Sequence, residues 1–166
     1  YGTTAQDQQE NNVGGLLRFE HDLANGRGTV FAGLSRSMRT ADATERYMAS
    51  NGMPNMRWVG NPEINPERHH QAEVGLLWKG DGWQADGSVY YNDVADYILR
   101  DRSHGVGGDN STIYRNVDAT LYGGELSVNK RYNANWQVGA GIAYVHAHND
   151  TDDLAIAQTP PLEGLF

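Results

Sequence analysis

The sequence predicts an all-β fold, an antiparallel sheet of strands that cross a membrane as a fragment of a transmembrane β-barrel. Apolar and polar residues alternate along several segments, as they do in strands whose two faces meet different surroundings. Tight turns and long polar connections also alternate along the chain. Outer-membrane barrels have this asymmetry, with short turns at one rim and long loops at the other. We expect about six to seven meander strands of a larger barrel.

The composition excludes a helical membrane protein and a nucleic-acid partner. No stretch approaches the roughly 20 consecutive apolar residues of a membrane-spanning helix. The mean hydropathy of -0.65 is typical of soluble proteins, but barrel strands also have a low average because only one face is apolar. The net charge is -8, with 13 Lys and Arg against 21 Asp and Glu. Phosphate binding needs clustered basic residues, so we expect no nucleic acid as partner.

The first predicted hairpin covers about residues 12–39. Its turn contains Asn25-Gly26, a dipeptide that favours two-residue hairpin turns. After the turn, Val30, Ala32 and Leu34 share one face, and the residues between them occupy the other.

The second and third predicted hairpins cover about residues 70–100 and 112–148. The second has the clearest alternation, with Ala72, Val74, Leu76 and Trp78 on one face and a tight turn at 80–82. The third turns at 132–135. Six polar residues fall on the opposite faces and are expected to point into a wet lumen: Glu73, Gln84, Asp86, Glu125, Asn129 and Gln137.

Long connections at about residues 40–69, 101–111 and 149–161 are expected to be extracellular loops. They are rich in Asn, Asp, Gly and Pro. Pro160 and Pro161 cannot lie within a lipid-facing strand because neither has an N–H to donate. We expect residues 164–166 to begin a seventh strand. More strands must complete the barrel, since an open sheet edge in lipid leaves backbone groups unpaired.

Aromatic residues flank two of the predicted tight turns. Trp78 and Trp83 surround one turn, and Tyr132 and Trp136 surround the other. Their recurrence at equivalent positions favours a girdle at the membrane–water interface. The alternative is that these rings simply pack well beside turns in strands.

Three motifs resemble recurring elements of TonB-dependent receptor barrels. They are Asn61-Pro62-Glu63-Ile64-Asn65-Pro66-Glu67 followed by Glu73-Val74-Gly75, then Asn116 to Gly123-Gly124-Glu125, and Thr159-Pro160-Pro161. Segments 39–47 and 57–62 look most like the copper-receptor branch of that family. The resemblance begins near Arg36 and covers most of the chain after it.

The resemblance implies a bacterial outer-membrane receptor that imports a metal or a metal chelate. Its barrel would have about 22 strands, filled by an N-terminal plug. The plug would contact the TonB energy-transducing complex, and outer-membrane lipid would surround the barrel. Neither the plug nor its TonB box occurs in these 166 residues, so we expect this chain to be one part of the barrel domain that cannot transport alone. No permanently bound cofactor is expected, and copper is the suspected cargo.

Candidate metal ligands are sparse. Met48, Met53 and Met56 lie in the first long connection, and their thioethers suit Cu(I), although loop methionines also fill packing gaps. His146 and His148 are two residues apart and should leave one strand face together. Adjacent His69 and His70 would point to opposite faces.

Other functions predict different residues. A ferric-siderophore receptor would use aromatic and Arg side chains at the outer vestibule, and Arg57, Trp58, Arg100 and Arg102 could serve there. We find no catalytic motif and expect no enzyme. A soluble secreted β-sandwich is the alternative from another class. It would bury Val138, Ala140, Ile142 and Tyr144 in a protein core.

Overall fold

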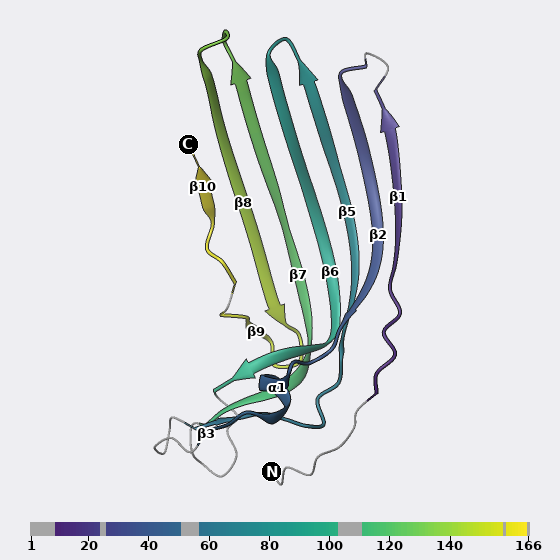
Figure 1. Ribbon diagram of the computed structural model, residues 1–166, viewed down its shortest axis with the longest axis vertical. Coiled ribbons are helices and arrows are strands. Elements are labelled where there is room, and N and C mark those ends of the chain that lie inside the picture. Colours follow the sequence, from purple (N-terminus) through teal and green to yellow (C-terminus); the bar gives the residue numbers. More distant parts are fainter. Residues whose placement is uncertain (1–8, 24–25, 51–56, 103–110, 158, 166) are drawn as a thin grey trace.

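The computed structural model describes residues 9–23, 26–50, 57–102, 111–157 and 159–165. Six long strands form an antiparallel meander in which each strand pairs with the next (Figure 1). They are β1 (Gly15–Asp22), β2 (Gly28–Arg39), β5 (Glu67–Gly80), β6 (Trp83–Asp101), β7 (Thr112–Arg131) and β8 (Gln137–Asn149). The predicted all-β antiparallel meander is therefore confirmed.

Five short elements accompany the meander. They are α1 (Ala43–Tyr47), β3 (Ala49–Ser50), β4 (Trp58–Val59), β9 (Leu154–Ala155) and β10 (Glu163–Leu165). β10 pairs with β8, with Gly164 opposite Ile142, so a seventh strand begins close to the expected position. Within the described ranges, no helix is long and apolar enough to span a membrane.

The described tight turns lie together at one end of the sheet, which we call the turn end (Figure 1). Between β5 and β6, Asp81 and Gly82 have φ angles of 53° and 76°. Positive φ at both central residues is the geometry of a two-residue turn that matches the twist of the strands. Between β7 and β8, the Asn133 side chain accepts the N–H groups of Asn135 and Trp136 and so closes the turn locally.

The opposite end, which we call the loop end, holds α1, β3, β4 and β9 (Figure 1). The connection 40–69, which is predicted to be a loop, contains α1 and the short strands β3 and β4. Asp42 and Glu45 explain the helix, because each side chain accepts the backbone N–H of the other, forming a capping box. Nothing in hydrophobic periodicity marks a helix of this length.

A β-bulge divides β6 into two parts. The pairing with β7 shifts between Val94 and Tyr97, and Asp96 has a φ of 59°. The Asp96 carbonyl accepts from Asn116 Nδ2 at 2.7 Å, which holds the bulge in place. Beyond it, β6 and β7 bend across the loop end (Figure 1). Because of this bend, the last part of β6, which ends at Asp101, lies at the loop end and not along the straight part of the sheet.

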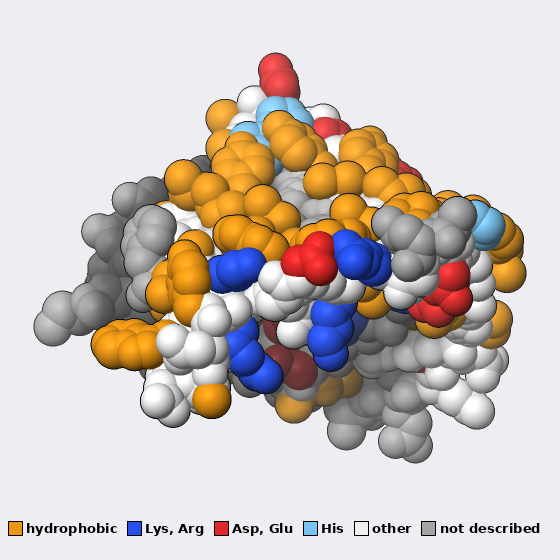
Figure 2. Space-filling view, turned by 90° about the horizontal axis from the view of Figure 1, so that it is seen from above, with side chains coloured by type: hydrophobic (Ala, Val, Ile, Leu, Met, Phe, Trp, Pro, Cys, Tyr) orange, Lys and Arg blue, Asp and Glu red, His pale blue; other side chains and the backbone are white. Residues whose placement is uncertain are grey.

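The straight parts of the strands have one apolar face. Cross-strand pairs place these residues in rows on the same side of the sheet. We call it the apolar face: Leu17, Phe19, Val30, Ala32, Leu34, Ala72, Val74, Leu76, Trp78, Val89, Tyr91, Tyr122, Leu126, Val138, Ala140, Ile142 and Tyr144. Seen from the turn end, hydrophobic side chains gather along one side of the molecule (Figure 2).

No layer of described residues covers this face. Val138 is 58% exposed and Ile142 50%, although a β-sandwich would bury both in its core. The soluble β-sandwich alternative is therefore wrong for the described residues. An apolar sheet face this large is stable against lipid and not against water.

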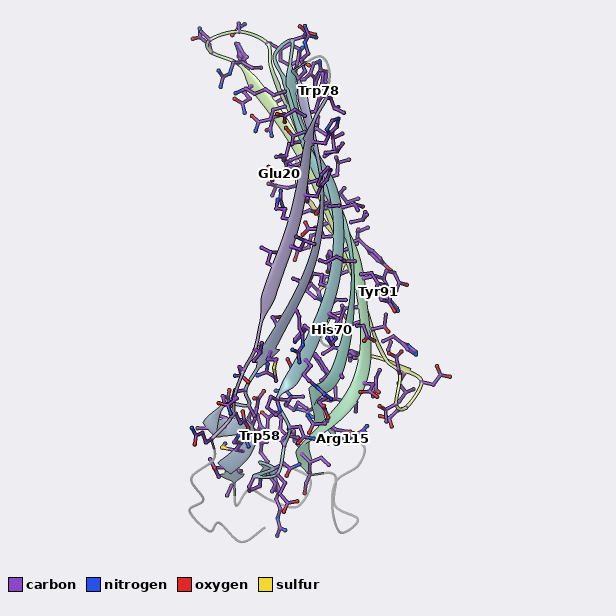
Figure 3. All side chains as sticks on the ribbon, turned by 90° about the vertical axis from the view of Figure 1, so that its right-hand side faces the viewer. Glu20, Trp58, His70, Trp78, Tyr91 and Arg115 are labelled. Atoms are coloured by element: carbon purple, nitrogen blue, oxygen red, sulfur yellow. The ribbon has the colours of Figure 1, made fainter. Side chains whose placement is uncertain are left out.

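The other side of the same strands is polar. We call it the polar face: Arg18, Glu20, Ser35, Gln71, Glu73, Gln84, Asp86, Ser88, Glu125, Ser127, Asn129 and Gln137. Glu20 and Tyr91 project from opposite sides of the sheet in Figure 3. The alternation predicted from the sequence is thus present across all six long strands.

Buried residues are concentrated at the loop end. One cluster joins Ala41, Ile64, Ile98 and Tyr114, with Trp58 packed against it. A second joins Val94, Ala119, Ala147 and Ile156. These two small cores fix the first long connection and the segment after β8 onto the bent ends of β6 and β7.

Candidate functional site

Glu67 organises the loop end on the polar face. The residue is 3% exposed. Arg39 Nη2 lies 2.7 Å from Glu67 Oε1 and Arg39 Nε lies 2.8 Å from Oε2. The N–H of Ile98 also donates to Oε1 at 2.8 Å. Burial alone would raise the pKa of Glu67, but hydrogen bonds from Arg39, His69 and Ile98 lower this pKa to about 2.

The same arginine holds α1 to the sheet. Arg39 Nη1 lies 3.0 Å from Glu45 Oε2, so its guanidinium bridges the helix and the start of β5. Hydrogen bonding to Glu67 raises the pKa of Arg39 despite partial burial. Arg46 of α1 is also buried, and it donates to the Pro62 carbonyl and pairs with Glu10. The first long connection is therefore an anchored structure.

Two of the predicted vestibule residues are in contact. Trp58 stacks on Tyr114 with ring centroids 6.2 Å apart, and the Arg100 guanidinium lies 5.6 Å from the Trp58 ring centroid. The Arg57 carbonyl accepts the Thr112 N–H beside them. Trp58 lies at the loop end in Figure 3. Trp58 and Arg100 are thus in contact at the loop end, with Trp58 partly buried against the core cluster.

Arg102 belongs to a neighbouring hollow that it shares with Arg100. This hollow has a volume of about 400 Å³ and is also lined by Asp101, Arg115 and Asp152. Arg115 donates to Asp101 Oδ2 at 2.6 Å and pairs with Asp152. Burial opposes the charge of Arg115, but these two carboxylates raise its pKa. Sequence reasoning missed this cluster, because only the turn after β8 brings Asp152 to Arg115.

The predicted metal ligands are not brought together in the described part of the chain. Met48 follows α1, where its N–H donates to the Thr44 carbonyl, and Met53 and Met56 lie outside the described residues. Among residues the structure describes, no three His, Cys, Asp or Glu side chains form a metal-sized group.

His146 and His148 share the side of β8 that continues the apolar face, as predicted. The His146 ring lies 5.0 Å from the Tyr122 ring, and His148 Nε2 lies 3.1 Å from Asp153 Oδ1. Both therefore turn away from the polar face. His69 and His70 do lie on opposite faces, and His69 contacts Glu67 and Asn92 on the polar face.

The four girdle residues lie at the turn end. Trp83 is opposite Lys130, whose Nζ lies 4.7 Å from the Trp83 ring centroid. The Tyr132 N–H donates to the Trp136 carbonyl across the turn. Trp78 also lies at this end in Figure 3. Rings beside the turns at one rim are what an interfacial girdle would need.

Comparison with known proteins identifies the family. The sequence matches the family described as "TonB dependent receptor-like, beta-barrel" over residues 7–164. A comparison with curated proteins finds no match. Among solved structures, the chain is similar to the copper transporter OprC, with 38% identity and a TM-score of 0.75 over 91% of this chain.

A second similar structure is the siderophore receptor PirA from Pseudomonas aeruginosa, with 22% identity and a TM-score of 0.65 over 82% of this chain. At this identity the similarity shows the fold alone. The chain spans 23% of the first of these structures and 28% of the second. The family consists of outer-membrane transporters, and its barrel accounts for the strand meander with one apolar and one polar face. The chain belongs to the TonB-dependent receptor family and is part of its β-barrel.

Proposed function

We propose that this chain is a segment of the barrel wall of an outer-membrane receptor that imports copper. The observation that carries the proposal is its 38% identity, over 91% of its length, with a copper transporter. The segments that resemble the copper branch, 39–47 and 57–62, fold together at the loop end around Arg39 and Glu45. Because the chain spans 23% of that transporter, the activity belongs to the larger protein.

The two faces support an outer-membrane location. The apolar face would contact lipid, and the aromatic rings at the turn end would mark the periplasmic interface. The loop end would then be extracellular. Energy for import would come from the TonB complex acting on the plug, as the family implies. The TonB complex would therefore need no binding site on these strands.

Copper capture would use the first long connection. Met48 supplies one thioether directly after α1, and Met53 and Met56 follow in the same connection. Thioethers favour Cu(I) over hard cations. A loop that is anchored at both ends would hold these side chains near the mouth of the barrel.

The test is copper accumulation by cells that contain the full-length receptor as their only copper receptor. We expect Met48→Leu, Met53→Leu and Met56→Leu together to reduce accumulation at limiting copper. Met38→Leu is the matched control, because Met38 belongs to β2 and lies on the side of the sheet that continues the apolar face. Equal accumulation by both variants would remove the methionines from the proposal, and no copper accumulation by the native receptor would refute copper as cargo.

A ferric siderophore is the second candidate, and the Trp58–Arg100 contact favours it. Iron chelates of this kind are often anionic and aromatic, so an aromatic and cationic surface would suit them. In this case the native receptor would support growth on a ferric siderophore, and Trp58→Ala with Arg100→Ala would weaken that growth while copper accumulation stayed at background.

A further inference from the structure

Three side chains on the polar face form a connected row at the loop end. Glu67 and His69 come from β5, and Asn92 comes from β6. Glu67 Oε2 lies 3.0 Å from His69 Nε2, and His69 Nδ1 lies 3.1 Å from Asn92 Nδ2. The row lies between the anchored first connection and the rest of the polar face.

The hydrogen-bond partners decide where the protons lie. Asn92 Nδ2 can only donate a hydrogen bond, so His69 Nδ1 accepts this bond with its lone pair. The proton of the neutral ring is then on Nε2, which donates it to Glu67 Oε2. Glu67 thus orients the imidazole in the way that carboxylates orient metal-binding histidines.

Asn92 carries an unused acceptor beside that lone pair. The residue is 8% exposed, and its Oδ1 has no hydrogen-bond partner among the described residues. Leaving a buried amide oxygen without a donor is unfavourable. Gln71, which also lies on the polar face, is directly opposite Asn92 in the pairing of β5 with β6. The imidazole of His69 and the amide of Asn92 are therefore in contact, with Gln71 at the neighbouring position of the same face.

We propose that His69, together with the side-chain oxygen of Asn92, binds copper on the inner wall of the barrel as Cu(II), the oxidation state that nitrogen and oxygen donors favour. This ion enters as Cu(II) and is not passed on from the Cu(I)-selective methionines, so no change of oxidation state is required. Rotation of the Asn92 amide would place Oδ1 beside Nδ1 and replace one hydrogen bond by two metal bonds. Imidazole is a suitable ligand for copper. Two protein ligands make a weak site, which lets the ion leave again. This inference rests on the proposed function, because it supplies a step in the same transport.

The test uses the full-length receptor in detergent, stripped of metal with a chelator and titrated with Cu²⁺. Electron paramagnetic resonance reports nitrogen ligation of each bound ion. We expect His69→Ala to remove one nitrogen-ligated Cu²⁺, a loss of affinity of roughly tenfold or more at that site. His70→Ala is the matched control, because this neighbouring histidine faces the opposite side of the strand, and it should leave the spectrum unchanged.

A second variant is expected to increase the affinity for Cu²⁺, which a misfolded protein would not do. Asn92→Asp places an anionic oxygen next to His69, so we expect Cu²⁺ to bind more tightly at this site. Unchanged spectra and affinities in His69→Ala and Asn92→Asp would overturn the inference. Copper accumulation by cells with the native receptor separates the two claims. Normal accumulation with unaltered Cu²⁺ ligation in both variants refutes the His69 site alone, and no accumulation refutes the proposed function.

Discussion

At the scale of single residues, Glu67 connects more of the loop end than any other side chain discussed above. Its two oxygens accept from Arg39, His69 and the Ile98 N–H. Through Arg39 it also reaches Glu45 of α1. The contribution of this carboxylate to stability therefore depends on its charge.

The pH dependence of the loop end should follow the ionisation of Glu67. Its pKa is about 2 in the folded protein against a reference of 4.5, so its stabilising effect is complete above pH 4.5 and is lost as pH falls toward 2. Pepsin is active in this window. We expect cleavage within segment 40–66 of the full-length receptor to rise as pH falls from 4.5 to 2.

Glu67→Gln is the comparison for that experiment. The amide keeps the shape of the side chain but loses the charge, which should cost roughly 1.5–3 kcal/mol of local stability. Segment 40–66 should then be cleaved already at pH 4.5. If the native receptor and the variant show the same pH profile, Glu67 does not control this segment.

At the scale of elements, the strands were predictable and the small structures between them were not. Period-2 alternation located the hairpins from local residues alone, because each strand must present one face to lipid. The bulge at Asp96, the pairing of Arg115 with Asp152 and the attachment of α1 to the sheet through Arg39 depend on contacts between distant segments. The sequence did contain one local signal for α1, Asp42-Ala43-Thr44-Glu45, which fits a capping box.

The cap of α1 can be tested at this scale. Asp42→Ala removes the side chain that accepts the Glu45 N–H, and such changes typically cost about 1 kcal/mol. Amide hydrogen exchange in residues 43–47 should become about five times faster. Thr44→Ala is the control, because Thr44 is exposed and alanine favours the helix. Equal exchange in both variants would mean that packing alone holds the helix.

At the scale of the whole molecule, the separation of the two faces is the feature that joins fold to function. Residues next to each other in β8 meet different surroundings. Ile142 lies on the apolar face, while Ala143 lies opposite Glu125 on the polar face. Candidate residues at the loop end follow the same rule, since His69 faces the polar side and His146 and His148 face the other.

Substitutions at these neighbouring positions should have unequal effects. Ile142→Arg places a charge against lipid near the middle of the membrane, which should lower the free energy of unfolding by about 2–4 kcal/mol. Ala143→Arg places the same side chain next to Glu125 and Glu163, so a much smaller change is expected. Unfolding of the full-length barrel in lipid bilayers measures both. Similar losses would contradict the assignment of the faces.

Arg39, His69 and the Ile98 N–H all donate to the same carboxylate, Glu67, so their positions depend on one another. A carboxylate offers about four acceptor positions, and the four hydrogen bonds described above occupy them. One group therefore fixes both the external segment, through Arg39 and Glu45, and the ring of His69 on the inner wall. Arg39 supplies two of these four bonds, so a change at Arg39 would alter the orientation of Glu67 and, through it, that of the His69 ring.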